Sequence, residues 1–314
     1  MPQVNIARLF DDNREKLRLE WIAGRGGGAK ALNSEFTKDS SRGLIGHLNF
    51  IHPNLIQVLG LSEVGYLNGL DAASCRSVLE KVATQDLACF IVAGAEQLPP
   101  VLVEVAESRA TPLFRSPLAS VELMWMLRPY LARALAESTT AHGVFLDVLG
   151  MGVFITGDSG VGKSELALEL ISRGSGLIAD DVVEIYRIGP ETLEGRCPAL
   201  LKDFLEVRGL GVLNIRTIFG EAALRTRKNI KLIVHLAKPA VTEGVPMERL
   251  PLNAGSETVM GVEIRRVTIP VAAGRNLAVL TEAAVRNYVL QLRGFDSTQE
   301  FVSRQSESMK KRES

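Results

Sequence analysis

The sequence predicts an α/β protein with two domains: a small N-terminal α/β domain over residues 1–130 and a C-terminal domain over residues 131–302, followed by a polar tail at 303–314. The length of 314 residues is about twice that of a typical domain. Strand-like and helix-like segments alternate from residue 87 onward, which is typical of α/β folds. Beyond residue 150, many strand-like segments accompany one glycine-rich loop and few crossover helices, so we expect a mixed, largely antiparallel sheet there.

The composition is that of a globular protein with a sizeable core, because 46% of the residues are hydrophobic and 23% are charged. Lys and Arg together number 36, as do Asp and Glu, so no overall field draws the chain to nucleic acid or to an anionic membrane. Cys75, Cys89 and Cys197 are far apart and form no C-x-x-C motif, which argues against a disulfide framework or a zinc site. The first 25 residues lack the apolar core of a signal peptide. We therefore expect a cytoplasmic protein with no membrane partner and no nucleic-acid partner.

The N-terminal domain is expected to consist of short strands and amphipathic helices. Hydrophobic spacing predicts helices over residues 4–22, 71–83, 99–108 and 118–137, and strands within 43–60, 87–94 and 111–115. Pro129 lies inside the last helix and should kink or break it, so we place the domain junction near this residue. The sequence of this half suggests no cluster of acid, base and nucleophile, and we expect a docking or assembly domain.

The central stretch of the chain is GVFITGDSGVGKSELALELISRG, residues 152–174. It predicts a buried strand, then a loop that matches G-x-x-x-x-G-K-[ST], then a helix that ends at Gly174. The loop comprises Gly157, Asp158, Ser159, Gly160, Val161, Gly162, Lys163 and Ser164. In this context the glycines turn backbone N–H groups toward one point, and the positive end of the helix adds to the attraction for phosphate. We predict a nucleotide-phosphate site (a P-loop), in which Lys163 reaches the outer phosphates and Ser164 holds Mg²⁺.

Two adjacent acids follow the strand that returns from this helix. Asp180 and Asp181 come directly after the apolar segment 177–179. Adjacent residues at a strand end cannot both face the same side, so one acid is expected to be a metal or structural partner and the other a base. The alternative is a pair of solvated turn aspartates.

A second acid stands in an apolar segment, LEVRGLGVLNI at residues 205–215. Glu206 and Arg208 are flanked by apolar residues, and Gly209 and Gly211 relax the backbone. This pattern predicts either a functional site or a buried ion pair.

The remaining titratable candidates are ambiguous from the sequence alone. His142 could equally be a packed histidine or a functional one, and His235 is expected to belong to the core. Arg249 and Arg275 are loop arginines that could equally lie on the surface.

The rest of the C-terminal half predicts further strands and one long helix. Strands are expected within 177–179, 182–188, 192–196, 212–216, 230–236 and 262–270, with 192–196 pairing back on 182–188 as a hairpin. Asn276 should cap a helix over 277–293 that Gly294 closes, and the polar tail is expected to fray.

Several of these blocks together resemble the HPr kinase/phosphorylase family of bacteria. They are GDSGVGKSELALELISRG, LIADD, LEVRGLGVLNI and PVAAGRN, and LEVRGLG is the block specific to that family. The resemblance covers residues 138–296 strongly. It extends more weakly to the N-terminal half through HLNFIHPNLIQVLG and CFIVAGAEQLPPVLVEVAE.

The resemblance implies an activity in two directions. Relatives use ATP to phosphorylate a serine on HPr, the small carrier protein of the sugar phosphotransferase system. They also remove that phosphate by attack of inorganic phosphate, which releases pyrophosphate. The family is hexameric, and its catalytic domain is similar to phosphoenolpyruvate carboxykinase around the P-loop.

The resemblance also implies residue roles. Gly157 to Ser164 would bind nucleotide, Ser164 with Glu206 would hold Mg²⁺, and Asp181 would exchange the proton of the serine hydroxyl. Residues expected to act on the phosphates are His142, Lys163 and Arg249, and residues expected to serve both reactions are Asp180, Arg208, Gly209 and Gly211. Pro270, Val271, Gly274 and Arg275 would matter mainly for phosphorolysis. Within that segment, Ala272-Ala273 replaces a basic residue and a proline that many relatives carry.

Two other functions are compatible with the motif. One is a P-loop kinase for a small molecule, with a substrate pocket enclosed within the second half of the chain. The other is a nucleotide-sensing regulator without catalysis, for which Asp181→Asn should leave function intact because binding needs no base.

Overall fold

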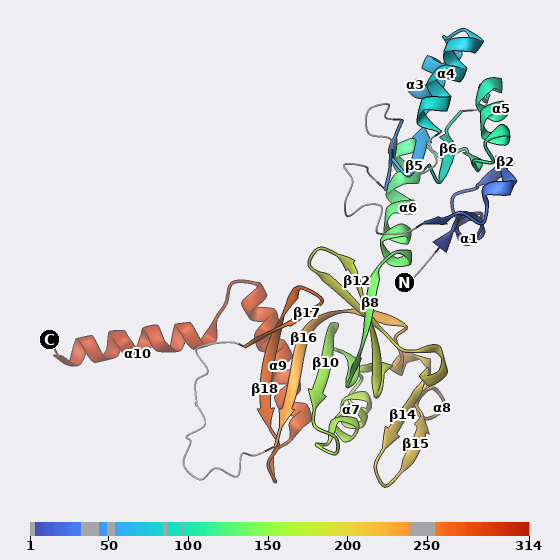
Figure 1. Cartoon of the computed structure of the whole chain (residues 1–314). Helices are drawn as coiled ribbons and strands as arrows, with labels where there is room; N and C mark the ends of the chain where they lie inside the picture. Colours follow the sequence, from blue (N-terminus) through green and yellow to red (C-terminus); the bar gives the residue numbers. More distant parts are fainter. Residues whose placement is uncertain are drawn as a thin grey trace. The chain divides into compact units, whose positions relative to one another are not determined.

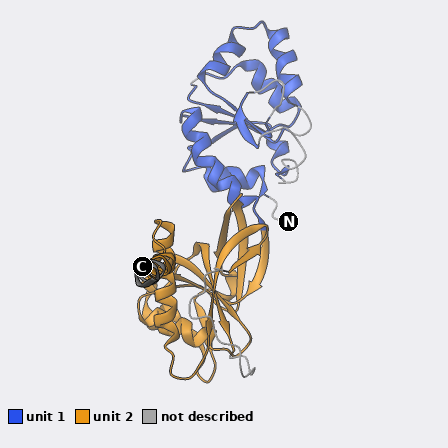
Figure 2. Cartoon of the chain, turned by 90° about the vertical axis from the view of Figure 1, so that its left-hand side faces the viewer, with its two compact units in different colours: residues 1–137 blue, residues 138–314 orange. Residues whose placement is uncertain are grey.

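The structure is a computed structural model that describes residues 4–32, 44–48, 54–83, 87–95, 97–238 and 255–313, with side chains as far as residue 305. The chain forms two compact units, residues 1–137 and 138–314 (Figures 1 and 2). The junction expected after residue 130 lies inside a helix of the first unit, α6 (Ser120–Ala134).

The N-terminal unit contains a five-stranded sheet in the order β2-β7-β6-β5-β4. Its strands are β2 (Glu20–Ala23), β4 (Ile45–His47), β5 (Ile56–Leu59), β6 (Cys89–Ala93) and β7 (Leu113–Ser116). β4 to β7 pair in parallel, whereas β2 pairs antiparallel with β7. All five residues of β6 are buried, as expected for a central parallel strand with both faces covered.

Helices flank this sheet. They are α3 (Leu61–Asn68), α4 (Ala72–Val82), α5 (Pro100–Ser108) and α6, and a short strand pair β1 (Val4–Asn5) and β3 (Ala31–Leu32) accompanies α1 (Ile6–Asn13). The predicted helices at 71–83 and 99–108 are confirmed by α4 and α5. α3 was not predicted. α6 runs through Pro129 as one helix, so of the kink or break expected there the break does not occur.

The predicted helix over residues 4–22 is also wrong, because only α1 is helical in that segment. The Asn5 side chain accepts a hydrogen bond from the Arg8 backbone N–H and begins the helix, and Arg18 takes a left-handed conformation (φ 50°) after it. The chain then pairs with β7, and the Trp21 ring meets the Phe114 ring edge to face at 4.9 Å between centroids. Pairing with a distant strand therefore overrides the local helical spacing.

The C-terminal unit is built on a nine-stranded sheet in the order β11-β9-β10-β16-β13-β12-β8, with β18 and β17 continuing from β16. The strands are β8 (Glu137–His142), β9 (Val144–Val148), β10 (Met151–Gly157), β11 (Gly176–Ala179), β12 (Val182–Gly189), β13 (Thr192–Arg196), β16 (Arg227–Ala237), β17 (Ser256–Val259) and β18 (Val262–Pro270). β16 pairs in parallel with β10 and β18, and five other described pairings are antiparallel. The mixed, largely antiparallel sheet agrees with the sequence prediction.

Further elements complete this unit: α7 (Lys163–Ser172), the hairpin β14 (Phe204–Val207) and β15 (Gly211–Asn214), α8 (Ile215–Phe219), α9 (Leu277–Leu292) and α10 (Ser297–Glu313), with short 3₁₀ turns at 199–201 and 221–223. The Asn276 side chain caps α9 by accepting a hydrogen bond from the Val279 N–H, as predicted. The tail expected to fray from residue 303 is instead part of α10.

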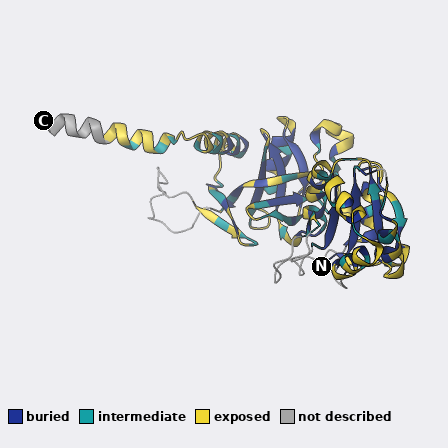
Figure 3. Cartoon of the chain, turned by 90° about the horizontal axis from the view of Figure 1, so that it is seen from above, coloured by how far each residue is buried: buried dark blue, intermediate teal, exposed yellow. Residues whose placement is uncertain are grey.

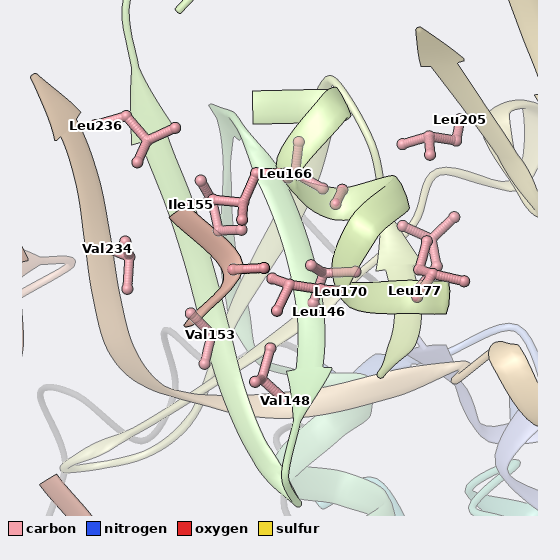
Figure 4. Close-up of a cluster of buried hydrophobic side chains, with 14 of the residues drawn as sticks. Leu146, Val148, Val153, Ile155, Leu166, Leu170, Leu177, Leu205, Val234 and Leu236 are labelled. Carbon is pink, nitrogen blue, oxygen red and sulfur yellow. The ribbon is translucent and has the colours of Figure 1, made fainter. Parts of the chain in front are cut away.

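A hydrophobic core joins α7, β14 and the sheet (Figure 4). Its buried members include Leu146, Val153, Ile155, Leu166, Leu170, Leu177, Leu205, Val234 and Leu236. Burial is concentrated in the sheets, whereas most exposed residues lie on helices and connections (Figure 3). This core fixes α7, and therefore the loop that precedes it, against the sheet.

Replacing Leu170 by alanine is expected to lower the free energy of unfolding by about 2–5 kcal/mol, because the side chain is 0% exposed and its loss leaves a cavity. The measurement is denaturant unfolding of the full chain. Leu292→Ala is the matched control, since Leu292 is 63% exposed, and it should change the free energy by no more than about 0.5 kcal/mol. Equal effects of the two substitutions would contradict the packing described for α7.

In the parts of the chain that the structure describes, we find no helix with the length and apolar character needed to span a bilayer.

Candidate functional site

A cleft of about 420 Å³ lies where the loop after β10 meets α7. β10, β16 and β18 run parallel and end at one edge, with Gly157 beside Leu236 and Ala237 beside Pro270. The carboxyl ends of parallel strands are the usual position of ligand sites in α/β sheets. The cleft is lined by His142, Gly143, Val144, Gly157, Ser159, Gly160, Gly162, Lys163, Ser164, Glu165, Asp180, Asp181, Glu206 and Arg208.

The loop has the backbone that its glycines predict. Gly157, Gly160 and Gly162 all have positive φ values, of 142°, 75° and 99°. A Cβ atom at Gly157 would lie 2.5 Å from the Leu236 carbonyl oxygen, so the loop can pass β16 only without a side chain at this position. α7 begins at Lys163 without a side-chain cap, which leaves its first-turn N–H groups available to an anion.

Two cations from different elements approach this loop. The Lys163 ammonium donates to the carbonyl oxygens of Gly157 and Asp158, both at 2.9 Å. Arg208 comes from the connection after β14, and its Nη1 lies 3.1 Å from the position that a Cβ atom of Gly160 would occupy. Two positively charged side chains therefore lie beside the glycine loop.

Asp180 is the buried acid of the pair, with 7% of its surface exposed. Its Oδ1 accepts a hydrogen bond from Ser164 Oγ (3.5 Å), and its Oδ2 accepts one from the Glu206 backbone N–H (2.8 Å). Burial raises the pKa of Asp180, although hydrogen bonds from backbone N–H groups, chiefly that of Glu206, oppose the rise. Asp180 thus ties the start of α7 to β14 and holds Ser164 and Glu206 in one cleft.

Asp181 is the exposed acid, with a side chain that is 75% exposed. It takes a left-handed conformation (φ 62°), and the Val182 N–H donates to the Asp180 carbonyl oxygen (2.8 Å) to close a three-residue turn around it. Its own carbonyl oxygen accepts a hydrogen bond from Gly143 (3.0 Å). Such a conformation is unusual for a non-glycine residue, and of the six described non-glycine residues that have it, Asp181 is the one that lines this cleft.

His142 approaches Asp181 from the end of β8. Its Nδ1 lies 3.6 Å from Asp181 Oδ1, and its side chain is 83% exposed. The two adjacent acids therefore face different surroundings, as predicted, and the exposed one is accompanied by an imidazole.

The structure does not bring every predicted residue into the cleft. Arg249 lies outside the described residues. Pro270 ends β18, and Val271, Gly274 and Arg275 come after it. None of the four lines the cleft, although β18 ends at the same edge of the sheet. The Asn276 amide joins this segment to α7 by donating to Glu169 Oε1 (3.0 Å).

His235 lies on β16 and outside the cleft lining. Its Nδ1 is 3.1 Å from Thr156 Oγ1 on the neighbouring strand. Partial burial lowers the pKa of His235, and the nearby Arg266 charge lowers it further. The ring is only half-buried and belongs to none of the hydrophobic core clusters, so the expectation that His235 is a core residue is wrong.

Three lining residues were not predicted: Gly143, Val144 and Glu165. Glu165 could have been found from its position directly after Ser164, in the first turn of α7. Gly143 and Val144 had no local signal, because their place depends on the hydrogen bond between Gly143 and Asp181.

Among the described residues, no group of three or more His, Cys, Asp or Glu side chains is arranged to hold a metal ion. The cleft nevertheless presents oxygen atoms from Ser164, Asp180 and Glu206. Hard oxygen donors of this kind suit Mg²⁺, which commonly takes one or two carboxylates and completes its shell with water and phosphate oxygens. The residues present therefore fit this ion.

The burial of Asp180 predicts a pH dependence of stability. Because its pKa is raised in the folded protein, the folded state binds the proton more readily than the unfolded state. The free energy of unfolding should therefore fall as the pH rises from the ordinary pKa of an aspartate through the raised pKa that Asp180 has in the folded protein. Asp180→Asn has no such titration, so its stability relative to the wild type should increase over that interval in unfolding measurements at several pH values. A difference that stays constant with pH would contradict the raised pKa.

Residues 133–305 match the HPr Serine kinase C-terminal domain, and residues 4–131 match the HPr Serine kinase N terminus. The HPr kinase/phosphorylase of Nitrosomonas europaea is 59% identical over 309 residues, covering 98% of this chain and 96% of the relative. That of Chromobacterium violaceum is 53% identical over 313 residues, covering 100% and 98%. With the fold and the cleft, these matches define an enzyme of the kinase class. The chain belongs to the HPr kinase/phosphorylase family.

A solved structure is also similar to part of the chain. It is the HPr(Ser) kinase/phosphatase from Coxiella burnetii, with 36% sequence identity and a TM-score of 0.46, covering 52% of this chain and 98% of the other.

Proposed function

We propose that this enzyme uses ATP to phosphorylate a regulatory serine on an HPr-type phosphocarrier protein, and that it removes the phosphate by phosphorolysis with inorganic phosphate, giving pyrophosphate. The observation that carries the proposal is the convergence of the glycine loop, Lys163 and Asp181 on one cleft. The names of the relatives supply the substrate class.

The glycine loop is proposed to act as a P-loop for ATP. Its positive-φ glycines and the uncapped start of α7 would direct backbone N–H groups at phosphate oxygens. Lys163 would exchange its two carbonyl partners in the loop for phosphate oxygens when nucleotide binds. Arg208 would add positive charge above Gly160 as charge develops on the transferred group.

Mg²⁺ is proposed to bind at Ser164 and Glu206, with Asp180 orienting both. The hydrogen bonds that Asp180 accepts from the Ser164 hydroxyl and the Glu206 N–H support this arrangement. When bound, the ion would neutralise phosphate charge.

Asp181 is proposed as the group that takes the proton from the serine hydroxyl and returns it in the reverse direction. It is the exposed acid of the cleft, and its turn is held by hydrogen bonds to the backbone on both sides. These bonds hold the backbone that carries the carboxylate, and a carboxylate within reach of a bound hydroxyl can exchange its proton. His142 would act beside it on the phosphates.

Phosphorolysis requires a place for a second anion. We propose that Pro270, Val271, Gly274 and Arg275 contribute to it, since β18 ends beside β16 at the edge of the sheet that carries the glycine loop. Arg249 remains a further candidate.

The assembly is proposed to be a hexamer in the cytoplasm, with a phosphoenolpyruvate-carboxykinase-like catalytic unit and an N-terminal unit that serves docking or assembly. These features follow from the resemblance stated above.

The test is intact-mass analysis of an HPr-type carrier after incubation with the full chain and Mg²⁺-ATP. The expected result is the gain of one phosphoryl group on the wild-type carrier and none on a carrier whose regulatory serine is replaced by alanine. Gain on both carriers would contradict the assignment of the acceptor. No gain with several HPr-type carriers would favour a small-molecule substrate.

A further inference from the structure

The segment that joins β18 to α9 is attached to the C-terminal unit at two points (Figure 1). At its start, the Val271 N–H donates to the carbonyl oxygen of Ala237 at the end of β16 (2.8 Å). At its end, the Asn276 amide donates to Glu169 Oε1 in α7 (3.0 Å). The segment is therefore fixed to the strand beside the glycine loop and to the helix that begins in that loop.

Between these two points the chain forms an exposed turn. The Arg275 N–H donates to the Ala272 carbonyl oxygen (3.2 Å), and Gly274 has the positive φ (81°) that a turn of this kind requires. Residues 272–276 are all exposed. The described parts of the chain provide no further hydrogen bond or ion pair to residues 272–275. The position of Arg275 therefore depends on the two attachments.

The Glu169 carboxylate that accepts from Asn276 is itself held in place. Arg173, at the end of α7, donates from Nη2 to the same Oε1 (2.7 Å). Its Nη1 lies 3.7 Å from Glu282 Oε2 in α9. The helices α7 and α9 also contribute to one hydrophobic core. The acceptor of the Asn276 amide is therefore oriented by side chains of both helices.

Asn276 makes two contacts with the two ends of its amide. Its Oδ1 caps α9 by accepting a hydrogen bond from the Val279 N–H (2.9 Å), while its Nδ2 donates to Glu169. An aspartate could make the first contact, because it caps helices as well as asparagine does. It could not make the second, because it has no N–H and its charge would repel that of Glu169. One substitution therefore separates the two contacts.

Phosphorolysis, as proposed above, brings a second phosphate to the phosphoserine. An oxygen of inorganic phosphate bonds to the phosphorus, the bond from phosphorus to the serine oxygen breaks, that oxygen takes the proton from Asp181, and pyrophosphate leaves. The two phosphates repel each other, and a guanidinium such as that of Arg275 offsets this by binding phosphate oxygens in a bidentate manner. Phosphorylation by ATP needs no second phosphate. The position of Arg275 therefore matters to one reaction and not to the other.

We propose that the hydrogen bond from Asn276 to Glu169 positions Arg275 for inorganic phosphate, and thereby sets the efficiency of phosphorolysis relative to that of phosphorylation. Asn276 and Glu169 are positioning residues and touch no substrate. Because α7 begins at Lys163, the bond fixes the turn relative to the site proposed for the nucleotide phosphates. The inference rests on the function proposed above, since only that function requires a second phosphate.

The test uses Asn276→Asp in the full chain, with the two reactions assayed separately. The expected result is a KM for inorganic phosphate raised about tenfold in phosphorolysis, which corresponds to the loss of a hydrogen bond to a charged group. In phosphorylation, kcat and the KM values for ATP and for the HPr-type carrier should stay within about twofold of wild type. Asn5→Asp is the matched control, since Asn5 caps α1 in the other unit by accepting from the Arg8 N–H (2.8 Å). It should change neither reaction.

A double substitution tests whether the bond itself is responsible. Glu169→Gln combined with Asn276→Asp reverses the direction of the bond, because the glutamine supplies an N–H and the aspartate accepts it. The KM for inorganic phosphate should return to within about threefold of wild type. A defect in helix capping or in stability would not be repaired in this way. Thermal unfolding shows whether each variant folds.

The inference is overturned if Asn276→Asp leaves the KM for inorganic phosphate unchanged, if it slows both reactions equally, or if the double substitution restores nothing. A failure of the proposed function looks different, because it appears in the wild type. If the wild type phosphorylates the carrier and yields no pyrophosphate from the phosphorylated carrier and inorganic phosphate, the phosphorolysis part of that function fails, and this inference fails with it.

Discussion

Replacing Lys163 by alanine is expected to abolish nucleotide-dependent phosphorylation. The Lys163 ammonium is held at the mouth of the glycine loop by two carbonyl oxygens, each 2.9 Å away, and lines the cleft where phosphates would bind. Removing one positioned donor from a phosphoryl-transfer site costs on the order of 10²–10³-fold in rate, and the loss of its charge also weakens nucleotide binding. The loss should therefore appear in kcat and in ATP affinity.

The measurement is a phosphorylation assay with titrated ATP, paired with thermal unfolding to show that the variant folds. Lys231→Ala is the control, since Lys231 is an exposed lysine of β16 that does not line this cleft. It should retain wild-type activity. Near-normal turnover by Lys163→Ala would remove the glycine loop from the catalytic mechanism.

Replacing Asp181 by asparagine is expected to lower phosphorylation by on the order of 10²–10⁴-fold while ATP binding is retained, because the positioned base is lost and the phosphate site is not. Asparagine tolerates the left-handed conformation that Asp181 adopts (φ 62°), so the turn should persist. Asp181→Asn should lower kcat without changing ATP affinity, whereas Lys163→Ala should lower both.

Asp203→Asn is a matched control for this substitution. Asp203 is another aspartate of the C-terminal unit with a left-handed backbone (φ 71°), and it pairs with Arg216 outside the cleft lining. Its replacement should leave the rate of phosphoryl transfer close to that of the wild type. If Asp181→Asn phosphorylates the carrier as fast as Asp203→Asn does, Asp181 is not the base, and a nucleotide-sensing function without catalysis gains support.

The glycine loop was predictable because its determinants are local. Positive φ values at Gly157, Gly160 and Gly162, and the helix start at Lys163, follow from the residues themselves. The split between a buried Asp180 and an exposed Asp181 was likewise predictable from the alternation of side chains at a strand end. The sequence did not indicate which acid would be the buried one.

Features that depend on distant parts of the chain were not predictable in the same way. Residues 20–23 form a strand because β7 is available to pair with them, although their spacing fits a helix. The hydrogen bond from the Glu206 N–H to Asp180 joins residues 26 positions apart, and that between Gly143 and Asp181 joins two separate turns. No local pattern encodes such contacts, which is why Gly143 and Val144 were missed.

The most direct test of the account follows the γ-phosphate of labelled ATP through both reactions in one preparation. The label should first appear on the serine of the HPr-type carrier and then, after the nucleotide is removed and unlabelled inorganic phosphate is added, in pyrophosphate. The same experiment with Lys163→Ala should place label in neither product. Label released as orthophosphate would mean hydrolysis in place of phosphorolysis, and label that never reaches the carrier would contradict the assignment of this cleft to protein phosphorylation.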